Sequence, residues 1–143
     1  MGKIVLNIVS QDKDQCYLQA LAKSPSYSAV TSFNCLGKNL VEFGKAIKGF
    51  PSAMGEREEF SIGAGMGRAE FSFQTVASTG LCECWVRIKG LHEEAGQTAE
   101  AFFPIDYLEP GSIEAFSREL IKMGTGHGKT AELKNQFEKD KTT

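Results

Sequence analysis

Polar and apolar residues alternate along the middle of the chain, between Glu58 and Leu108. The clearest run covers residues 81–89. Its apolar residues of one parity are Cys82, Cys84, Val86 and Ile88. The other parity holds Glu83, Trp85, Arg87 and Lys89. Successive side chains of a strand point to opposite faces, so this run predicts a strand with one buried face and one wet face.

Three neighbouring runs show the same alternation, and turn residues separate them. They are Glu58–Ile62, Glu70–Val76 and Thr98–Leu108. Ser78-Thr79-Gly80 stands between two runs and predicts a tight hairpin, because glycine accepts a positive φ at little steric cost. Pro104 donates no hydrogen bond, which predicts an edge strand or a bulge in the last run. The four runs predict an antiparallel meander.

The N-terminal part of the chain is also rich in strand patterns. Lys3–Ser10 and Tyr27–Leu36 alternate in the same way and predict two strands. Gln15–Lys23 fits either a strand face or a helical stripe. We favour a strand, because the segment is short and polar turns bound it on both sides.

Two segments change to a helical period. In Gly37–Phe50 the apolar residues recur at steps of three and four, at Leu40, Phe43, Ile47 and Phe50. A second helix is predicted over Leu108–Met123 and ends at Gly124. Its apolar stripe is Ile113, Phe116, Leu120 and Met123.

The predicted fold class is α+β, with a single antiparallel sheet of six or seven strands in meander order and two helices packed on one face. Residues 1–123 form the single predicted domain. Residues 124–143 are expected to be a flexible or short helical tail, because Leu133 and Phe137 are their only apolar pair at helical spacing.

Composition fits one soluble globular domain. The chain has 143 residues, of which 24% are charged and 41% hydrophobic, and its formal net charge is −2. No basic block stands out except the lysine-rich tail, which glutamate and aspartate balance, so nucleic-acid binding is disfavoured. The apolar run Ile4–Val9 is too short for a signal-peptide core, and no segment reaches membrane-spanning length. We therefore expect a cytoplasmic protein without a membrane partner.

The cysteines and histidines do not form a recognisable reactive motif. Cys16, Cys35, Cys82 and Cys84 contain no CxxC pair, and we expect free buried thiols in a reducing compartment. A metal site would require all four to converge, and we expect neither a metal nor a cofactor. His92 and His127 lack a convergent partner, so no catalytic residue is predicted.

Two glycine-rich segments resemble nucleotide-binding loops but depart from them. Gly128-Lys129-Thr130 has Met123 where the phosphate-binding loop requires its first glycine, and a helix precedes it instead of a strand. Gly63-Ala64-Gly65-Met66-Gly67 misplaces the third glycine of the dinucleotide fingerprint. We interpret both segments as connections.

The strand positions of the meander that are expected to point outward hold aromatic and charged residues. Trp85, Arg87 and Phe102 share this face if the last two strands pair, with Glu83 and Glu100 at the rim. Exposed aromatic residues with arginine are enriched at interfaces. We expect these five residues to bind a protein partner or a second copy of the chain.

Three stretches resemble a family of small uncharacterised bacterial α+β domains, several of which lie near toxin–immunity genes. They are Leu-Val-Glu-Phe-Gly-Lys-Ala-Ile (40–47), Gly55-Glu56-Arg57 and Leu-Glu-Pro-Gly-Ser-Ile-Glu (108–114). Phe50-Pro51 stands where the family pattern has a tryptophan. The resemblance implies an antiparallel sheet with two helices and carries over no catalytic residue.

The leading functional hypothesis is a bacterial, non-enzymatic binding or interaction domain, with immunity-type protein binding as one form. The alternative is a small-ligand-binding protein or an enzyme with a pocket between the sheet and the helices. An aromatic and charged outer face favours the first hypothesis, whereas a deep apolar pocket with convergent polar groups would favour the second.

Overall fold

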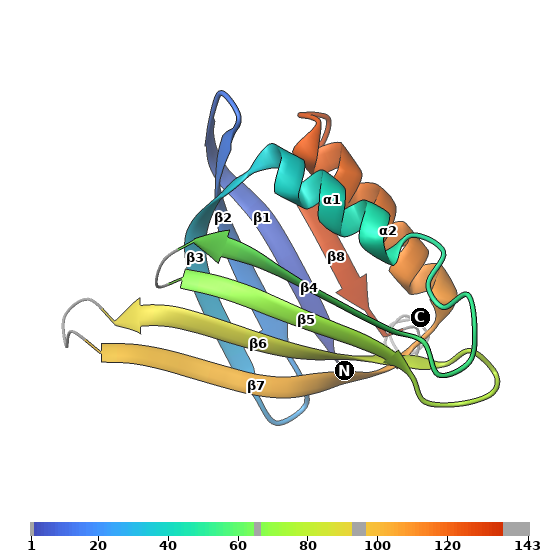
Figure 1. Ribbon diagram of the computed structural model, residues 1–143. Helices are drawn as coiled ribbons and strands as arrows, with labels where there is room; N and C mark the ends of the chain where they lie inside the picture. Colours follow the sequence, from blue (N-terminus) through green and yellow to red (C-terminus); the bar gives the residue numbers. More distant parts are fainter. Residues whose placement is uncertain (1, 65–66, 93–96, 136–143) are drawn as a thin grey trace, which may run out of the picture.

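The computed structural model describes residues 2–64, 67–92 and 97–135. The helices and strands (Figure 1) follow one another as β1 (Lys3–Asp12), β2 (Gln15–Lys23), β3 (Ser28–Leu36), α1 (Gly37–Ile47), β4 (Arg57–Ala64), β5 (Gly67–Thr75), β6 (Cys82–His92), β7 (Gln97–Leu108), α2 (Pro110–Gly124) and β8 (Thr130–Lys134). The ambiguous segment Gln15–Lys23 is a strand, as the sequence favoured.

The strands form two sheets, and the prediction of a single sheet of six or seven strands is wrong. Sheet A has the order β3-β2-β1-β8, and sheet B has the order β4-β5-β6-β7. All pairs in both sheets are antiparallel. Sheet B is the predicted meander, and Pro104 lies in its edge strand β7, as expected.

The physical reason for this error is that alternation identifies a strand and its buried face but not its neighbour. The first three strands are separated from the meander by α1 and the turns after it, so hydrogen bonding does not continue from β3 to β4. The buried faces of the two sheets instead pack against each other, and one hydrophobic core joins them. Each sheet therefore covers much of the buried face of the other. In a single sheet, the helices alone would have to cover that face.

The two sheets approach each other closely along β3. A Cβ atom on Gly67 of β5 would lie 2.8 Å from the carbonyl oxygen of Ser32. A Cβ atom on Gly90 of β6 would lie 2.8 Å from Oγ1 of Thr31. Gly67 therefore lets sheet B approach the backbone of β3, and Gly90 leaves room for the side chain of Thr31.

The helices pack together at the opposite side, where the sheets diverge (Figure 1). α1 contacts β4 of sheet B, and α2 contacts β8 of sheet A. The prediction that both helices pack on one face of a single sheet is corrected accordingly: the pair bridges the two sheets. α1 ends at Ile47 rather than Phe50. Neither helix of the described chain is long and apolar enough to cross a membrane.

Small residues set the close contact between the helices. A Cβ atom on Gly37 would lie 2.8 Å from the carbonyl oxygen of Gly124, and one on Gly44 would lie 2.7 Å from that of Ser117. Ser117 is buried, and its Oγ donates a 2.6 Å hydrogen bond to the carbonyl oxygen of Gly44. Two pairs of small residues, seven positions apart on each helix, therefore hold the backbones together.

Phe43 of α1 occupies the centre of the core and is fully buried. Its ring lies 4.9 Å from that of Phe60, 4.8 Å from that of Phe71 and 5.8 Å from that of Phe116, between ring centroids. These partners come from β4, β5 and α2. One side chain thus joins sheet B to both helices, and aromatic rings fill the space between them.

Residues 130–134 form β8, a strand where the sequence predicted a flexible or short helical tail. β8 pairs with β1, with Leu133 opposite Ile4 and Ala131 opposite Leu6. Leu133 and Ala131 are fully buried, so their alternation, and not a helical spacing, is the relevant pattern. Phe137, the other residue of the predicted helical pair, lies outside the described residues.

We expect Gly44→Ala to destabilise the protein by about 1–3 kcal/mol, because the added Cβ would lie 2.7 Å from the carbonyl oxygen of Ser117 and overpack the contact. Gly111→Ala is the matched control: it lies in α2, and an added Cβ meets nothing within 4 Å. Urea unfolding of both variants would measure the difference. Equal free energies of unfolding would show that the helices can move apart without cost.

We expect Leu133→Ala to lower the free energy of unfolding by about 2–5 kcal/mol, since it removes a fully buried side chain. Thr130→Ala, at an exposed position of the same strand, removes only a hydrogen bond from its Oγ1 to Oδ1 of Asn7 and should change it by about 1 kcal/mol or less. Thermal and urea unfolding would test both. A wild-type melt for Leu133→Ala would mean that β8 is dispensable for the core.

Candidate partner-binding surface

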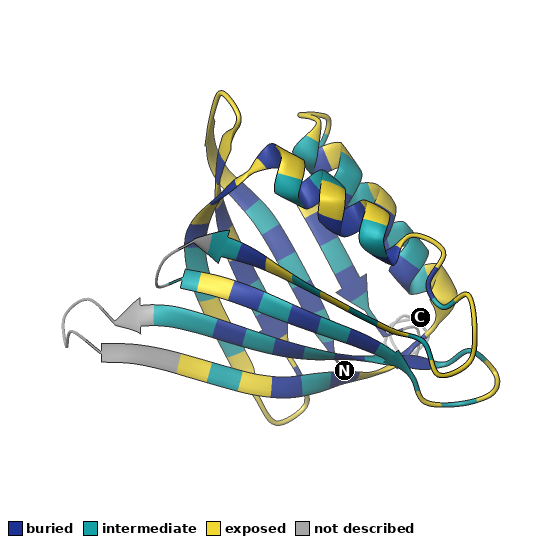
Figure 2. Ribbon diagram, viewed as in Figure 1, coloured by how far each residue is buried: buried dark blue, intermediate teal, exposed yellow. Residues whose placement is uncertain are grey.

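The outer face of sheet B carries the residues that the sequence placed there. Figure 2 shows buried and less buried positions alternating along its strands. Cys84 and Val86 are fully buried, whereas Trp85, between them, and Arg87, which follows Val86, are half-buried. Phe102, directly opposite Arg87 in the register of β6 and β7, is 51% exposed. The aromatic residues therefore face outward on adjacent strands.

Trp85, Arg87 and Phe102 form a layered cluster. The ring centroids of Trp85 and Phe102 are 5.0 Å apart, and the planes are inclined by 34°. The guanidinium carbon of Arg87 lies 4.1 Å from the centroid of the Phe102 ring. A guanidinium at this distance is attracted to the ring face. We call these three residues, with Glu83 and Glu100 beside them, the sheet-B patch.

Carboxylates hold the two polar groups of the cluster in place. Arg87 forms ion pairs with Glu100 and with Glu70, the latter at 3.3 Å between Nε and Oε1. The indole Nε1 of Trp85 donates a 3.1 Å hydrogen bond to Oε1 of Glu83. Gln74 donates to the same oxygen. Each rim glutamate thus restrains a side chain of the patch, which lowers the entropy that binding would cost.

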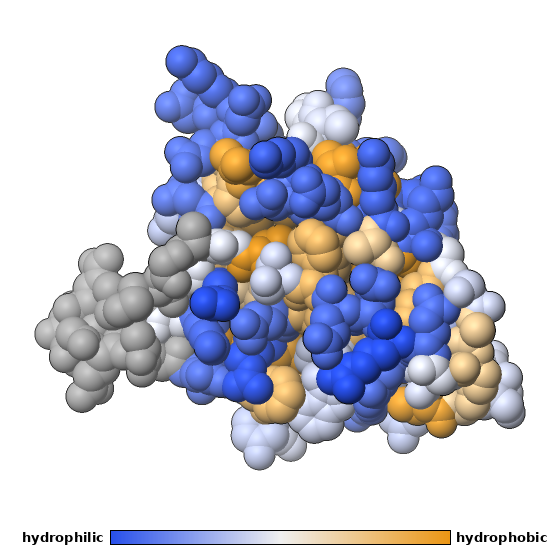
Figure 3. All heavy atoms as spheres, in the orientation of Figure 1, coloured by the Kyte–Doolittle hydropathy of each residue, from blue (hydrophilic) through white to orange (hydrophobic). Residues whose placement is uncertain are grey.

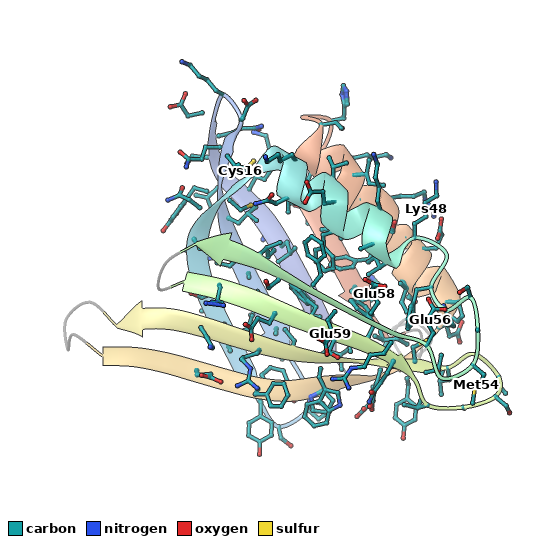
Figure 4. The ribbon with its side chains drawn as sticks, in the orientation of Figure 1. Cys16, Lys48, Met54, Glu56, Glu58 and Glu59 are labelled. Carbon is teal, nitrogen blue, oxygen red and sulfur yellow. The ribbon has the colours of Figure 1, made fainter. Side chains whose placement is uncertain are left out.

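A groove lies beside the patch on the same face. Its volume is about 420 Å³, and Trp85 and Arg87 of β6 line one side of it. Glu59 (Figure 4) and Arg57 of β4 line the opposite side, and their side chains form an ion pair of 2.9 Å. Ser72 of β5 lies between the two sides, opposite both Trp85 and Glu59. Because the side chain of Ser72 is small, the groove remains open between the larger side chains on its two sides.

Hydrophilic and hydrophobic residues are mixed on the side of the molecule that Figure 3 shows. On the outer face of sheet B, cross-strand pairs bring unlike charges together, as for Glu70 with Arg87 and Lys89 with Glu100. This face can offer charged and aromatic contacts together, which suits a polar and specific partner more than an apolar one.

The sequence identified the centre of this surface but missed its other side. All five predicted residues lie together, on β6 and β7. Glu70 could have been added, because its parity in β5 places it on the same face. Parity also places Glu59 outward, but its position across Ser72 from Trp85 depends on the register of β4 against β5, which alternation does not show. This pairing brings Glu59 opposite Ser72.

All four cysteines are buried free thiols, as expected. Burial raises the pKa of Cys35 to about 12 and that of Cys82 to about 11. Burial also raises the pKa of Cys84, and that of Cys16, which lies near the start of α1 (Figure 4). A thiol that keeps its proton is a poor nucleophile and a poor metal ligand. Within the described residues, no three histidine, cysteine, aspartate or glutamate side chains are grouped as metal ligands would be.

Comparisons of the chain with protein-family models, curated proteins and solved structures find no match. Function must therefore be inferred from the geometry and chemistry of the surface itself.

The thiols predict a loss of stability at high pH. Above the ordinary cysteine pKa of 9.0, the unfolded chain loses thiol protons, whereas Cys35, with a pKa of about 12, retains its proton in the folded protein. The folded state then binds more protons, so the free energy of unfolding should fall as pH rises from about 9 to 11. Urea unfolding at several pH values would measure this slope. A Cys35→Ala and Cys82→Ala double variant should show a shallower fall, and an identical slope would exclude these two thiols as its cause.

Proposed function

We propose that this protein is a non-enzymatic binding protein whose sheet-B patch contacts a protein partner. The observation that carries this proposal is the cluster of Trp85, Arg87 and Phe102 on an outer sheet face, with half of Phe102 exposed. Tryptophan and arginine are enriched among residues that dominate binding energy. Stacked side chains on a folded sheet, away from the core, support a role in association.

The charge arrangement supports a partner with matching polar groups. Arg87 lies between Glu70 and Glu100, so its guanidinium is already oriented before a partner arrives. The glutamate rim and the aromatic centre resemble the usual division of an interface into a polar rim and a less polar core. The partner would then be another protein, bound in the manner of an immunity protein, or a second copy of the chain.

The groove beside Trp85 favours a second candidate function, the binding of a small polar ligand. Its volume of about 420 Å³ falls within the range of small-molecule sites, and Arg57, Glu59 and Ser72 offer donors and acceptors. We place the protein partner first, because Phe102, which also lines the groove, is 51% exposed, and Glu100 extends the cluster beyond the groove.

Trp85→Ala should weaken partner binding by about 2 kcal/mol or more, as the loss of a central aromatic anchor does, while leaving the melt cooperative. The partner would be recovered by affinity purification from the native organism, and calorimetry would give both affinities. Sedimentation velocity would test a second copy as the partner. Tyr17→Ala, at a position of sheet A that is 39% exposed, is the matched control.

Equal affinities of Trp85→Ala and wild type would contradict the proposal. Unfolding of Trp85→Ala would mean that the indole belongs to the core. In that case Phe102→Ala, which alters a residue that is 51% exposed, would still test the patch.

A further inference from the structure

The outer face of sheet A carries three lysines in one row across the strands. Lys3 of β1 lies directly opposite Lys23 of β2 on one side and Lys134 of β8 on the other. All three residues have the outward parity of their strands. We call this set the lysine row. It crosses three adjacent strands, so its members lie about 4.8 Å apart, the ordinary spacing of strands.

The lysine row is incompletely neutralised. Lys134 forms a 3.1 Å ion pair with Glu132 of its own strand. Lys3 and Lys23 form no ion pair with any residue that the structure describes. Like charges directly opposite one another on a sheet are destabilising, and here they occur twice in succession. An anionic group bound over the row would remove this repulsion.

An apolar row lies next to the lysine row on the same face. Leu21 of β2 is opposite Val5 of β1 on one side and Val30 of β3 on the other. On β8 the residue opposite Val5 is Glu132, which pairs with Lys134, so the two rows lie side by side on β1 and β2. Val5 and Leu21 are half-buried, and Val30 is 60% exposed. Residues two apart on a strand are about 6.8 Å apart, so the two rows run parallel at that separation. A single ligand can therefore contact both.

We propose that the outer face of sheet A binds an acidic amphipathic helix of a protein partner. The helix lies across the strands, with one acidic residue per turn over the lysine row and one apolar residue per turn over the apolar row. Its pitch of about 5.4 Å is close to the strand spacing of about 4.8 Å, so successive turns reach successive strands. Acidic side chains meet Lys3 and Lys23, and apolar side chains cover Val30 and Leu21.

This occupant fits better than an anionic membrane surface. The row that follows the apolar row consists of Asn7, Gln19, Ser32 and Thr130, which are polar and uncharged. Membrane binding would favour cations on both sides of an apolar band, whereas this face has cations on one side only. A helix with adjacent acidic and apolar stripes reproduces that one-sided order.

The test uses a fluorescein-labelled, alanine-rich peptide of about 18 residues, long enough to be helical, with a glutamate stripe beside a leucine stripe. Fluorescence anisotropy measures its binding to the full chain. The double variant Lys3→Glu and Lys23→Glu should bind it at least about tenfold more weakly, because two attractive contacts become repulsive. The same variant should gain affinity for a peptide with lysine in place of glutamate.

The control is the double variant Lys38→Glu and Lys45→Glu, which makes the same charge change at two exposed positions of α1. An equal loss of affinity in this control would show that the effect depends only on the net charge of the protein, and it would overturn the proposal. So would equal wild-type binding of a scrambled peptide, or tighter binding to vesicles of anionic phospholipid than to the peptide. Should the double variant fail to fold, Val30→Asp at the 60% exposed edge position should weaken peptide binding on its own.

Discussion

The close contact between the two helices is the constraint on which the rest of the structure depends. Gly37 and Gly44 of α1 meet Gly124 and Ser117 of α2 at distances that leave no room for larger side chains. This contact makes the helix pair narrow enough to lie where the two sheets diverge, and it directs Phe43 into the core. At the opposite side, glycines on β5 and β6 allow sheet B to reach β3. Small residues at both ends therefore determine how the sheets are inclined, and large aromatic residues fill the space between.

The two sheets and the helices share one core, so the side chains on the outer faces of both sheets do not pack in it. Parity then divides each strand cleanly: Val86 belongs to the core, and its neighbours Trp85 and Arg87 belong to the surface. The two outer faces differ in chemistry. On sheet B, Arg87 is held between carboxylates, so charges are paired within the face. On sheet A, Lys3 lies opposite two other lysines, so charge is left for a ligand to neutralise.

The sequence predicted the features that depend on neighbouring residues in the chain. It failed for the features that depend on contacts between residues far apart in the chain. The strands of the meander and the aromatic residues of the patch followed from period-two alternation, which is a local property. The division into two sheets did not, because alternation is the same whichever strand lies alongside. β8 was missed for the same reason: Ala131 and Leu133 are too few to show a period, and β1 supplies their partners from the other end of the chain. The lysine row was equally hidden, since Lys3, Lys23 and Lys134 come together only through register.

The separation of surface from core has a consequence for any variant of this protein. Substitutions on the outer faces of sheets A and B act on residues that share no core partner, so their effects on stability should be nearly independent. Their effects on binding are also separable, because the sheet-B patch and the lysine row lie on different sheets. The inward residues behave differently, since Phe43 contacts rings from β4, β5 and α2 at once. A change at Phe43 therefore disturbs sheet B and both helices together, so its effect on stability should not add to those of changes in its ring partners.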